Sequence, residues 1–142
     1  MRSIGVVIFA SLVGWLALPA LAQDPNEPTD PDEQAAYLGL SSSYLACVNH
    51  NDGSMPSMQR CADAELFYQD KRLNRVYEKL MGSLPPGERT ALRDEERAWI
   101  KTRDRTCALP VTPGQGQVLD ATSCSVTESA RRARVLELRA TK

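Results

Sequence analysis

The chain has 142 residues, of which 42% are hydrophobic and 25% are charged. Its 17 basic residues are balanced by 18 acidic ones, so the net charge at pH 7 is −1. So small a net charge excludes the strongly basic composition typical of nucleic-acid-binding proteins, and it gives no reason to expect an anionic membrane partner. The length suits a single domain with its own core.

The first 22 residues have the features of an export signal. Arg2 precedes an apolar run from Ile4 to Leu18, and Ala20-Leu21-Ala22 is a small-x-small cleavage site. The run is short for a membrane span. We therefore expect cleavage after Ala22, a periplasmic or secreted location, and no membrane anchor in the mature protein. Loss of Arg2 leaves 16 basic and 18 acidic residues, a net charge of about −2.

Residues 23–33 are rich in Pro, Asp and Glu and show no periodic pattern, which predicts a disordered leader before a domain spanning residues 34–142. A first helix is predicted over residues 34–48, although Gly39 and a run of three serines weaken it. The next helix is predicted from residues 54–57 to about Gly82, because its apolar residues recur at helical spacing.

A Pro-Pro-Gly sequence at residues 85–87 should turn the chain into a third helix that ends near Cys107. Helices joined by so short a loop are expected to be antiparallel neighbours. Residues 109–123 contain two prolines and two glycines and are predicted to form a loop. The last helix is expected to begin at a capping box of Ser125 and Glu128, with Val135 and Leu138 facing the core and its arginines in solvent. No strand pattern is evident, so the predicted fold is an all-α bundle of about four helices around this long antiparallel hairpin.

Four cysteines follow the signal, and in an oxidising compartment an even number favours disulfides. Three pairings are possible, and we favour Cys47–Cys61 and Cys107–Cys124, because each pair brackets one loop between predicted helices. Each bridge would close a loop of roughly 15 residues and stabilise the fold by about 3 kcal/mol in the chain-entropy model. The alternative is a metal site of Cys47, His50 and Cys61, but His50 lies in a sequence typical of a turn.

The third predicted helix carries a polar stripe on one face. Glu96, Trp99 and Arg103 share that face, because they are separated by three and four residues. Buried charges need partners. We predict that Arg103 pairs with Asp70 or Glu96, that Asn74 completes the network and that Trp99 covers it. Leu92 and Cys107 extend the same stripe at its two ends.

The sequence gives little basis for catalysis. The single histidine lies beside a predicted disulfide, so no serine or cysteine nucleophile has an evident base. Glu95 and Glu96 are adjacent on a helix and should point to different faces, unlike a glycosidase pair. The chain has no phosphate-binding loop, zinc-helix motif or nucleotide fingerprint. We therefore expect a non-enzymatic protein without a cofactor or metal.

Three motifs together resemble the LprI-like lysozyme inhibitor family of small, exported, helical bacterial proteins with paired cysteines. The resemblance covers about Cys47 to Leu138, with Glu96 where the family commonly has Gln and Thr102 where it has an aromatic residue. The motifs are Asp70-x-x-Leu73-Asn74-x-x-Tyr77-x-x-Leu80, then Glu96-Arg97-Ala98-Trp99-Ile100-x-x-Arg103-Asp104-x-x-Cys107, then Cys124 and Thr127-x-x-x-Arg131-x-x-x-Val135.

The resemblance implies an envelope protein that binds lysozyme or a related muramidase and blocks its cleft. It marks no inhibitory residue, so the partner-binding residues are left unassigned. We favour the loops as contact surfaces, including the disulfide-closed loop over residues 109–123. The alternative is a structural or stress-related envelope module that binds another protein and has no affinity for lysozyme.

Overall fold

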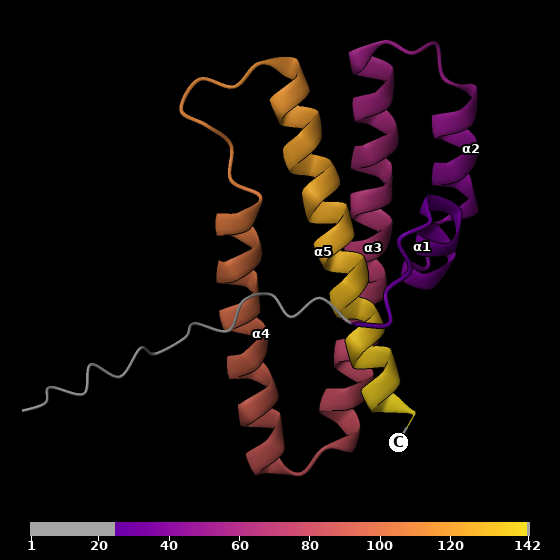
Figure 1. Ribbon diagram of the computed structural model, residues 1–142. Coiled ribbons are helices and arrows are strands. Elements are labelled where there is room, and N and C mark those ends of the chain that lie inside the picture. Colours follow the sequence, from indigo (N-terminus) through magenta and orange to yellow (C-terminus); the bar gives the residue numbers. More distant parts are fainter. Residues whose placement is uncertain (1–24, 142) are drawn as a thin grey trace, which may run out of the picture.

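The computed structural model describes residues 25–141, and these residues form five α-helices and no strand (Figure 1). This confirms the predicted all-α fold. The predicted signal peptide, residues 1–22, lies outside the described residues. Within residues 25–141 no helix has the length and apolarity needed to cross a bilayer. The helices are α1 (Pro31–Leu38), α2 (Ser42–His50), α3 (Met55–Ser83), α4 (Pro86–Thr106) and α5 (Gln115–Ala140).

The centre of the molecule is the pair α3 and α5, which pack against each other more extensively than any other two helices (Figure 1). Ser129, Ala130 and Ala133 of α5 are completely buried, and their small side chains let the two backbones approach closely. The core contains three residues of α3, one of α4 and two of α5: Leu73, Val76, Leu80, Leu92, Ala133 and Leu136.

The predicted turn between α3 and α4 is present, because α3 ends at Ser83 and α4 begins at Pro86. The two helices run antiparallel, but α4 packs mainly against α5 rather than against α3. It stands at one edge of the bundle, while α1 and α2 lie on the other side of α3 (Figure 1). Only Leu92 of α4 belongs to the buried core cluster, with Trp99 packed against its margin.

The prediction of one helix over residues 34–48 is wrong, because Gly39 divides this segment into α1 and α2. Gly39 has a φ of 68° and ends α1 in the left-handed conformation that glycine adopts most readily. The predicted disorder of residues 23–33 is also wrong for its described part. Asp30 caps α1 at residue 31, and Glu27 contacts Arg131 of α5 at 2.7 Å.

Three side chains of α3 hold this α1–α2 corner. Glu65 is 1% exposed and accepts a hydrogen bond from the backbone N–H of Ser41, the cap of α2, at 2.9 Å. Its negative charge is therefore placed at a helix N-terminus, where it is favourable. Gln69 donates to the Gly39 carbonyl at 3.0 Å, and Arg72 donates to the Leu38 carbonyl at 2.5 Å. Arg72 also bonds Glu137 of α5 at 2.6 Å, so one guanidinium links three helices.

Helix α5 starts ten residues before the predicted capping box. It begins at Gln115, where the side chain of Gln117 accepts a hydrogen bond from the backbone N–H of Gly114. Ser125 lies inside the helix and its hydroxyl donates to the carbonyl four residues earlier. Val135 and Leu138, predicted to be buried, are 44% and 48% exposed, because α5 buries Ala133 and Leu136 instead.

We expect Gly39→Ala to lower the free energy of unfolding by about 2 kcal/mol, since the left-handed conformation alone disfavours a side chain by about 1–2 kcal/mol. A Cβ at this position would also lie 2.9 Å from Nη1 of Arg72. Urea denaturation followed by circular dichroism measures the effect. Gly82→Ala is the control: a Cβ there meets nothing within 4 Å, so helix propensity should raise stability by up to about 1 kcal/mol. Equal effects of the two changes would contradict this account of Gly39.

Candidate functional site: the loop between α4 and α5

The loop between α4 and α5 presents apolar side chains to solvent. Val111 at its tip is fully exposed and Leu109 is 48% exposed. The loop spans residues 107–114, about half the length predicted from the sequence, and arcs away from the helices (Figure 1). Pro110 and Pro113 restrict its backbone. Such a short, projecting and restricted loop is suited to entering a cleft on another protein.

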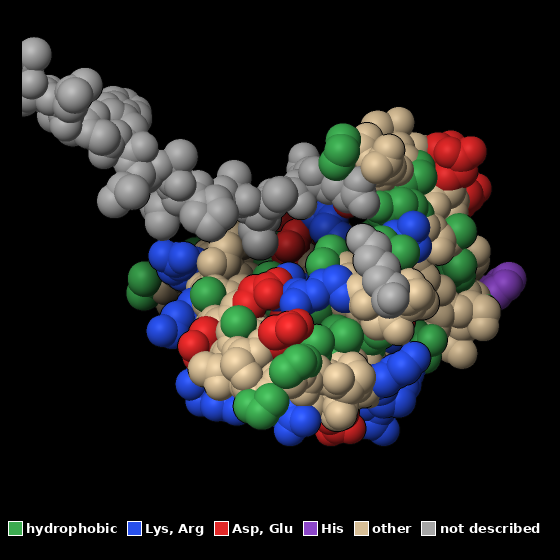
Figure 2. All heavy atoms as spheres, turned by 90° about the horizontal axis from the view of Figure 1, so that it is seen from below, with side chains coloured by type: hydrophobic (Ala, Val, Ile, Leu, Met, Phe, Trp, Pro, Cys, Tyr) green, Lys and Arg blue, Asp and Glu red, His purple; other side chains and the backbone are tan. Residues whose placement is uncertain are grey.

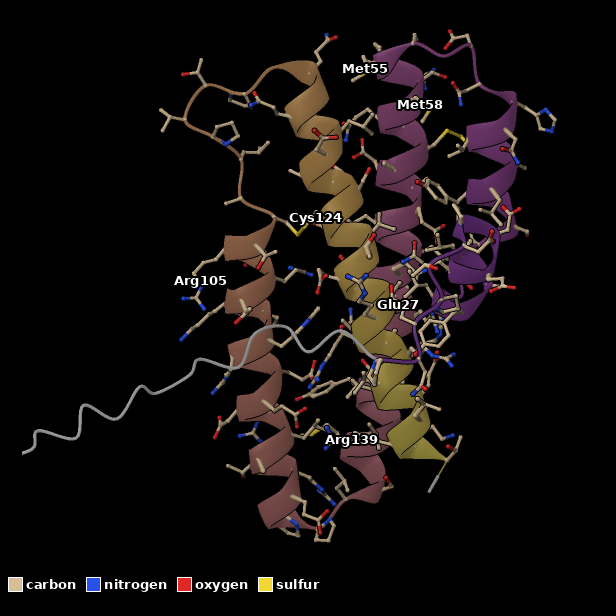
Figure 3. All side chains as sticks on the ribbon, in the orientation of Figure 1. Glu27, Met55, Met58, Arg105, Cys124 and Arg139 are labelled. Carbon is tan, nitrogen blue, oxygen red and sulfur yellow. A yellow bond between two sulfur atoms is a disulfide. The ribbon has the colours of Figure 1, made fainter. Side chains whose placement is uncertain are left out.

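The two predicted disulfides are both present. Cys107–Cys124 joins the end of α4 to α5 across the base of the loop, with a Cα–Cα distance of 5.5 Å (Figure 3). Cys47–Cys61 joins α2 to α3, with a Cα–Cα distance of 5.8 Å. The alternative metal site is therefore wrong, because its two cysteines are bonded to each other. Among residues 25–141 no cluster of His, Cys, Asp and Glu has the arrangement of a metal site.

The predicted polar stripe of α4 does face the bundle, and it holds α4 and therefore the loop in place. Leu92 and Glu96 are 1% and 8% exposed, and Trp99, Arg103 and Cys107 are half-buried. Because α4 contributes so little to the apolar core, its position depends on the polar contacts of this face. Those contacts form two groups, one around Arg103 and one around Arg132.

Arg103 pairs with Asp70 of α3, as one of the two predicted alternatives proposed, with 3.7 Å between Nη1 and Oδ1. Ser129 of α5 donates its hydroxyl to Asp70 at 3.1 Å and lies 3.4 Å from Nη1 of Arg103. Asp104, also named in the sequence analysis, accepts from Arg103 at 3.0 Å and is exposed. Asn74 is exposed, so the prediction that it completes the network is wrong; Ser129 has that role.

Trp99 lies between two guanidinium groups. Its ring centroid is 5.2 Å from Cζ of Arg103 and 6.0 Å from Cζ of Arg132, distances typical of cation–π interaction. The ring also packs against the core cluster, as does Tyr77, while Leu73 belongs to the cluster itself. Trp99 therefore covers the network, as predicted, and joins it to the apolar core.

Glu96 pairs with Arg132 of α5 and not with Arg103. Arg132 is only 11% exposed, and its Nε lies 2.9 Å from Oε1 of Glu96. Arg132 also contacts Glu95 at 2.6 Å, and Arg139 reaches the same carboxylate at 2.9 Å. Burial would lower the pKa of Arg132, but the hydrogen bonds to Glu96 and Glu95 outweigh it and raise this pKa.

The prediction that the arginines of α5 lie in solvent is thus wrong for Arg131, Arg132 and Arg134, which are half-buried, and only Arg139 of the four is exposed. Arg132 and Arg139 are seven residues apart and share one face of the helix, and the neighbouring acids 95 and 96 lie opposite. These charges were visible in the sequence, but their pairing could be assigned only once α5 is known to lie beside α4.

A second concave region lies between α2 and α3. It is a groove of about 600 Å³ bordered by Tyr44, Tyr68, three serines and the Cys47–Cys61 disulfide. Burial, and then the nearby charge of Glu65, raise the pKa of Tyr44. Both oxygens of Glu65 accept hydrogen bonds from Ser41, so this carboxylate serves the fold.

The family model described as "Lysozyme inhibitor LprI" matches residues 47–136, which is 90 of the 142 residues. The chain belongs to the LprI lysozyme inhibitor family. The matched region begins at Cys47 and ends at Leu136, so it contains both disulfides, the α3–α4 hairpin and the loop. No curated protein and no solved structure that we compared with the chain gave a match.

In this LprI-family protein we expect Arg132→Leu to lower the free energy of unfolding by about 3 kcal/mol, because it leaves the carboxylate of Glu96 buried without its cation. The double variant Glu96→Leu/Arg132→Leu should be more stable than Arg132→Leu alone, since it removes the stranded charge as well. Urea denaturation of the wild type, both single variants and the double variant measures this coupling. Additive losses would show that the pair is not coupled.

Glu95 should make stability depend on pH. Burial alone would raise its pKa, but the hydrogen bonds from Arg132 and Arg139 together lower it below the usual value near 4.3. A lowered folded-state pKa gives stability that is present above the unfolded-state pKa and is lost as pH falls through the folded-state value. Glu95→Gln should therefore be less stable than wild type at pH 7, by less than about 1 kcal/mol because Glu95 is half-exposed.

The difference between Glu95→Gln and wild type should narrow below about pH 4 and vanish once Glu95 is protonated in both states. Thermal unfolding of the two proteins from pH 3 to 7 measures it. A gap that stays constant over this range would show that the charge of Glu95 does not stabilise the α4–α5 contact.

Proposed function

We propose that this protein is an exported, non-enzymatic inhibitor of a lysozyme-type muramidase, and that the loop over residues 107–114 enters the cleft of the enzyme. Membership of the LprI lysozyme inhibitor family supports the class of partner. The observation that carries the choice of surface is the full exposure of Val111 at the tip of a disulfide-closed loop.

The rigidity of the loop favours binding. The Cys107–Cys124 bridge closes its base, two prolines restrict its backbone, and helices fix both of its ends. A segment that is already ordered loses less conformational entropy when it binds. Residues near the centre of a protein–protein contact commonly contribute more to affinity than those at its rim.

Export is part of the proposal. The predicted signal peptide would place the chain outside the cytoplasm, and disulfides persist in oxidising compartments. The two bridges of the structure support that location. The cell wall that lysozyme cleaves also lies outside the cytoplasm, so an exported inhibitor would meet the enzyme where it acts.

A lysozyme turnover assay on bacterial cell walls with the purified mature protein tests this function. Wild type should inhibit in a dose-dependent manner, and Val111→Asp should raise the half-inhibitory concentration by at least about tenfold, since it places a charge in an apolar contact. Phe67→Asp is the control, because Phe67 is another exposed apolar residue, 63% accessible, on α3.

Three results would contradict the proposal in different ways. No inhibition by wild type would favour an envelope module with another protein partner. Equal loss in both variants would point to unfolding, which circular dichroism detects. Loss only in Phe67→Asp would place the binding surface on α3 instead of on the loop.

A further inference from the structure

A row of positive charges runs along the outer face of α4. Its five members, which we call the α4 basic stripe, follow one another at intervals of four residues, so they form a slowly winding line along nearly the whole helix. All five are exposed. At 1.5 Å per residue the line is about 24 Å long. The members of the stripe are Arg89, Arg93, Arg97, Lys101 and Arg105.

The stripe is not neutralised by the acids of its own helix. Glu95 and Glu96 are turned away from it toward Arg132 and Arg139 of α5, and Asp104 is bonded to Arg103. Among the described residues only Arg97 has a carboxylate within 4 Å, Asp94 at 3.8 Å, with both side chains about two-thirds exposed. Pairing α4 to α5 through its acids therefore leaves the cations of its outer face in excess.

This arrangement disfavours the isolated helix. Like charges four residues apart repel, and the stripe contains four such pairs in succession. On a helix face that only contacts solvent, acidic residues placed between the cations would reduce their repulsion and stabilise the helix. The repulsion would instead be relieved by binding to a negative surface.

The position of α4 exposes the stripe to a flat partner. The helix forms one edge of the bundle in Figure 1. Seen from below, Lys and Arg side chains gather along the left edge of the molecule, the side on which α4 lies (Figure 2). Arg105 points away from the bundle in Figure 3. Four of the five cations are arginines, whose planar guanidinium groups bind phosphate oxygens in pairs.

We propose that the α4 basic stripe binds the phosphate headgroups of an anionic bilayer, so that the protein rests on a membrane surface. The net charge of the mature chain does not oppose this, since it is only about −2 and charges beyond about 8 Å are screened at physiological salt. Successive members of the stripe turn by about 40° around the helix, so three neighbouring cations such as Arg93, Arg97 and Lys101 can contact one plane together. Ile100 beside the stripe, 41% exposed, adds apolar contact at the interface.

Co-sedimentation of the mature protein with vesicles tests the proposal. We expect binding to vesicles containing about one-third anionic phospholipid, little binding to purely zwitterionic vesicles, and loss of binding at high salt. Each cation near an anionic surface strengthens binding about fivefold. The triple variant Arg93→Gln/Arg97→Gln/Lys101→Gln should therefore bind about a hundredfold more weakly.

A matched triple variant on α3 is the control. Lys71, Arg75 and Lys79 are also exposed and spaced by four residues, but they form a line of only three, and Arg75 and Lys79 border the same hollow as Glu137. Lys71→Gln/Arg75→Gln/Lys79→Gln makes the same change in charge and should retain most of the binding. Circular dichroism establishes that both triple variants are folded.

Three outcomes would overturn the proposal. One is equal binding to anionic and zwitterionic vesicles, or none to either. Another is equal loss in the α3 and α4 variants, which would reflect total charge alone. The third is binding to soluble polyphosphate without binding to anionic vesicles, which would assign the stripe to a soluble polyanion. None of these depends on lysozyme inhibition, so the two functions can fail separately.

Discussion

The ion pair between Glu96 of α4 and Arg132 of α5 is the interaction on which the outer half of the structure depends. Helix α4 contributes one residue, Leu92, to the buried core cluster, so apolar packing alone gives it little hold on the bundle. The Glu96–Arg132 pair is nearly as inaccessible as that core, with both side chains 11% exposed. A charge buried to this degree is strongly unfavourable without its partner, so the pair determines where α4 lies along α5.

The position of α4 in turn determines the exposed features of the molecule. With Glu95 and Glu96 facing α5, the remaining charges on the outer side of α4 are mostly positive. With the end of α4 fixed beside α5, the Cys107–Cys124 bridge can close and the loop must project beyond it. On the opposite side of α3, Arg72 has a comparable role, since it ties α1 and α5 to the central helix.

The elements that were predicted correctly from the sequence are those specified by nearby residues. The apolar spacing of α3, the proline turn at residue 85 and the shared face of Glu96, Trp99 and Arg103 are all local properties. The disulfide pairing was also predictable, because each bridge closes a short stretch of chain. Glycine has a low helix propensity, which predicts only a weak helix around Gly39; its role as a helix boundary follows from its left-handed conformation.

The errors arose where distant parts of the chain meet. The buried face of α5 runs through Ser129, Ala133 and Leu136, so Val135 and Leu138 lie outside it and were wrongly assigned to the core. Similarly, Glu96 could not be assigned to Arg132 or Arg103 before the neighbour of α4 was known. The sequence predicts a loop after α4 that contains the candidate binding site. The loop is about half as long as predicted, because α5 begins at Gln115.

The order of the disulfides along the chain has a consequence for biogenesis. Each bridge joins a cysteine to the next one in sequence, and the two bridged segments do not overlap. If the chain is exported as we propose, emergence from its N-terminus presents Cys47 and Cys61 to the oxidant before either of the other cysteines has appeared. Such vectorial emergence would favour the native pairing at every stage of oxidation.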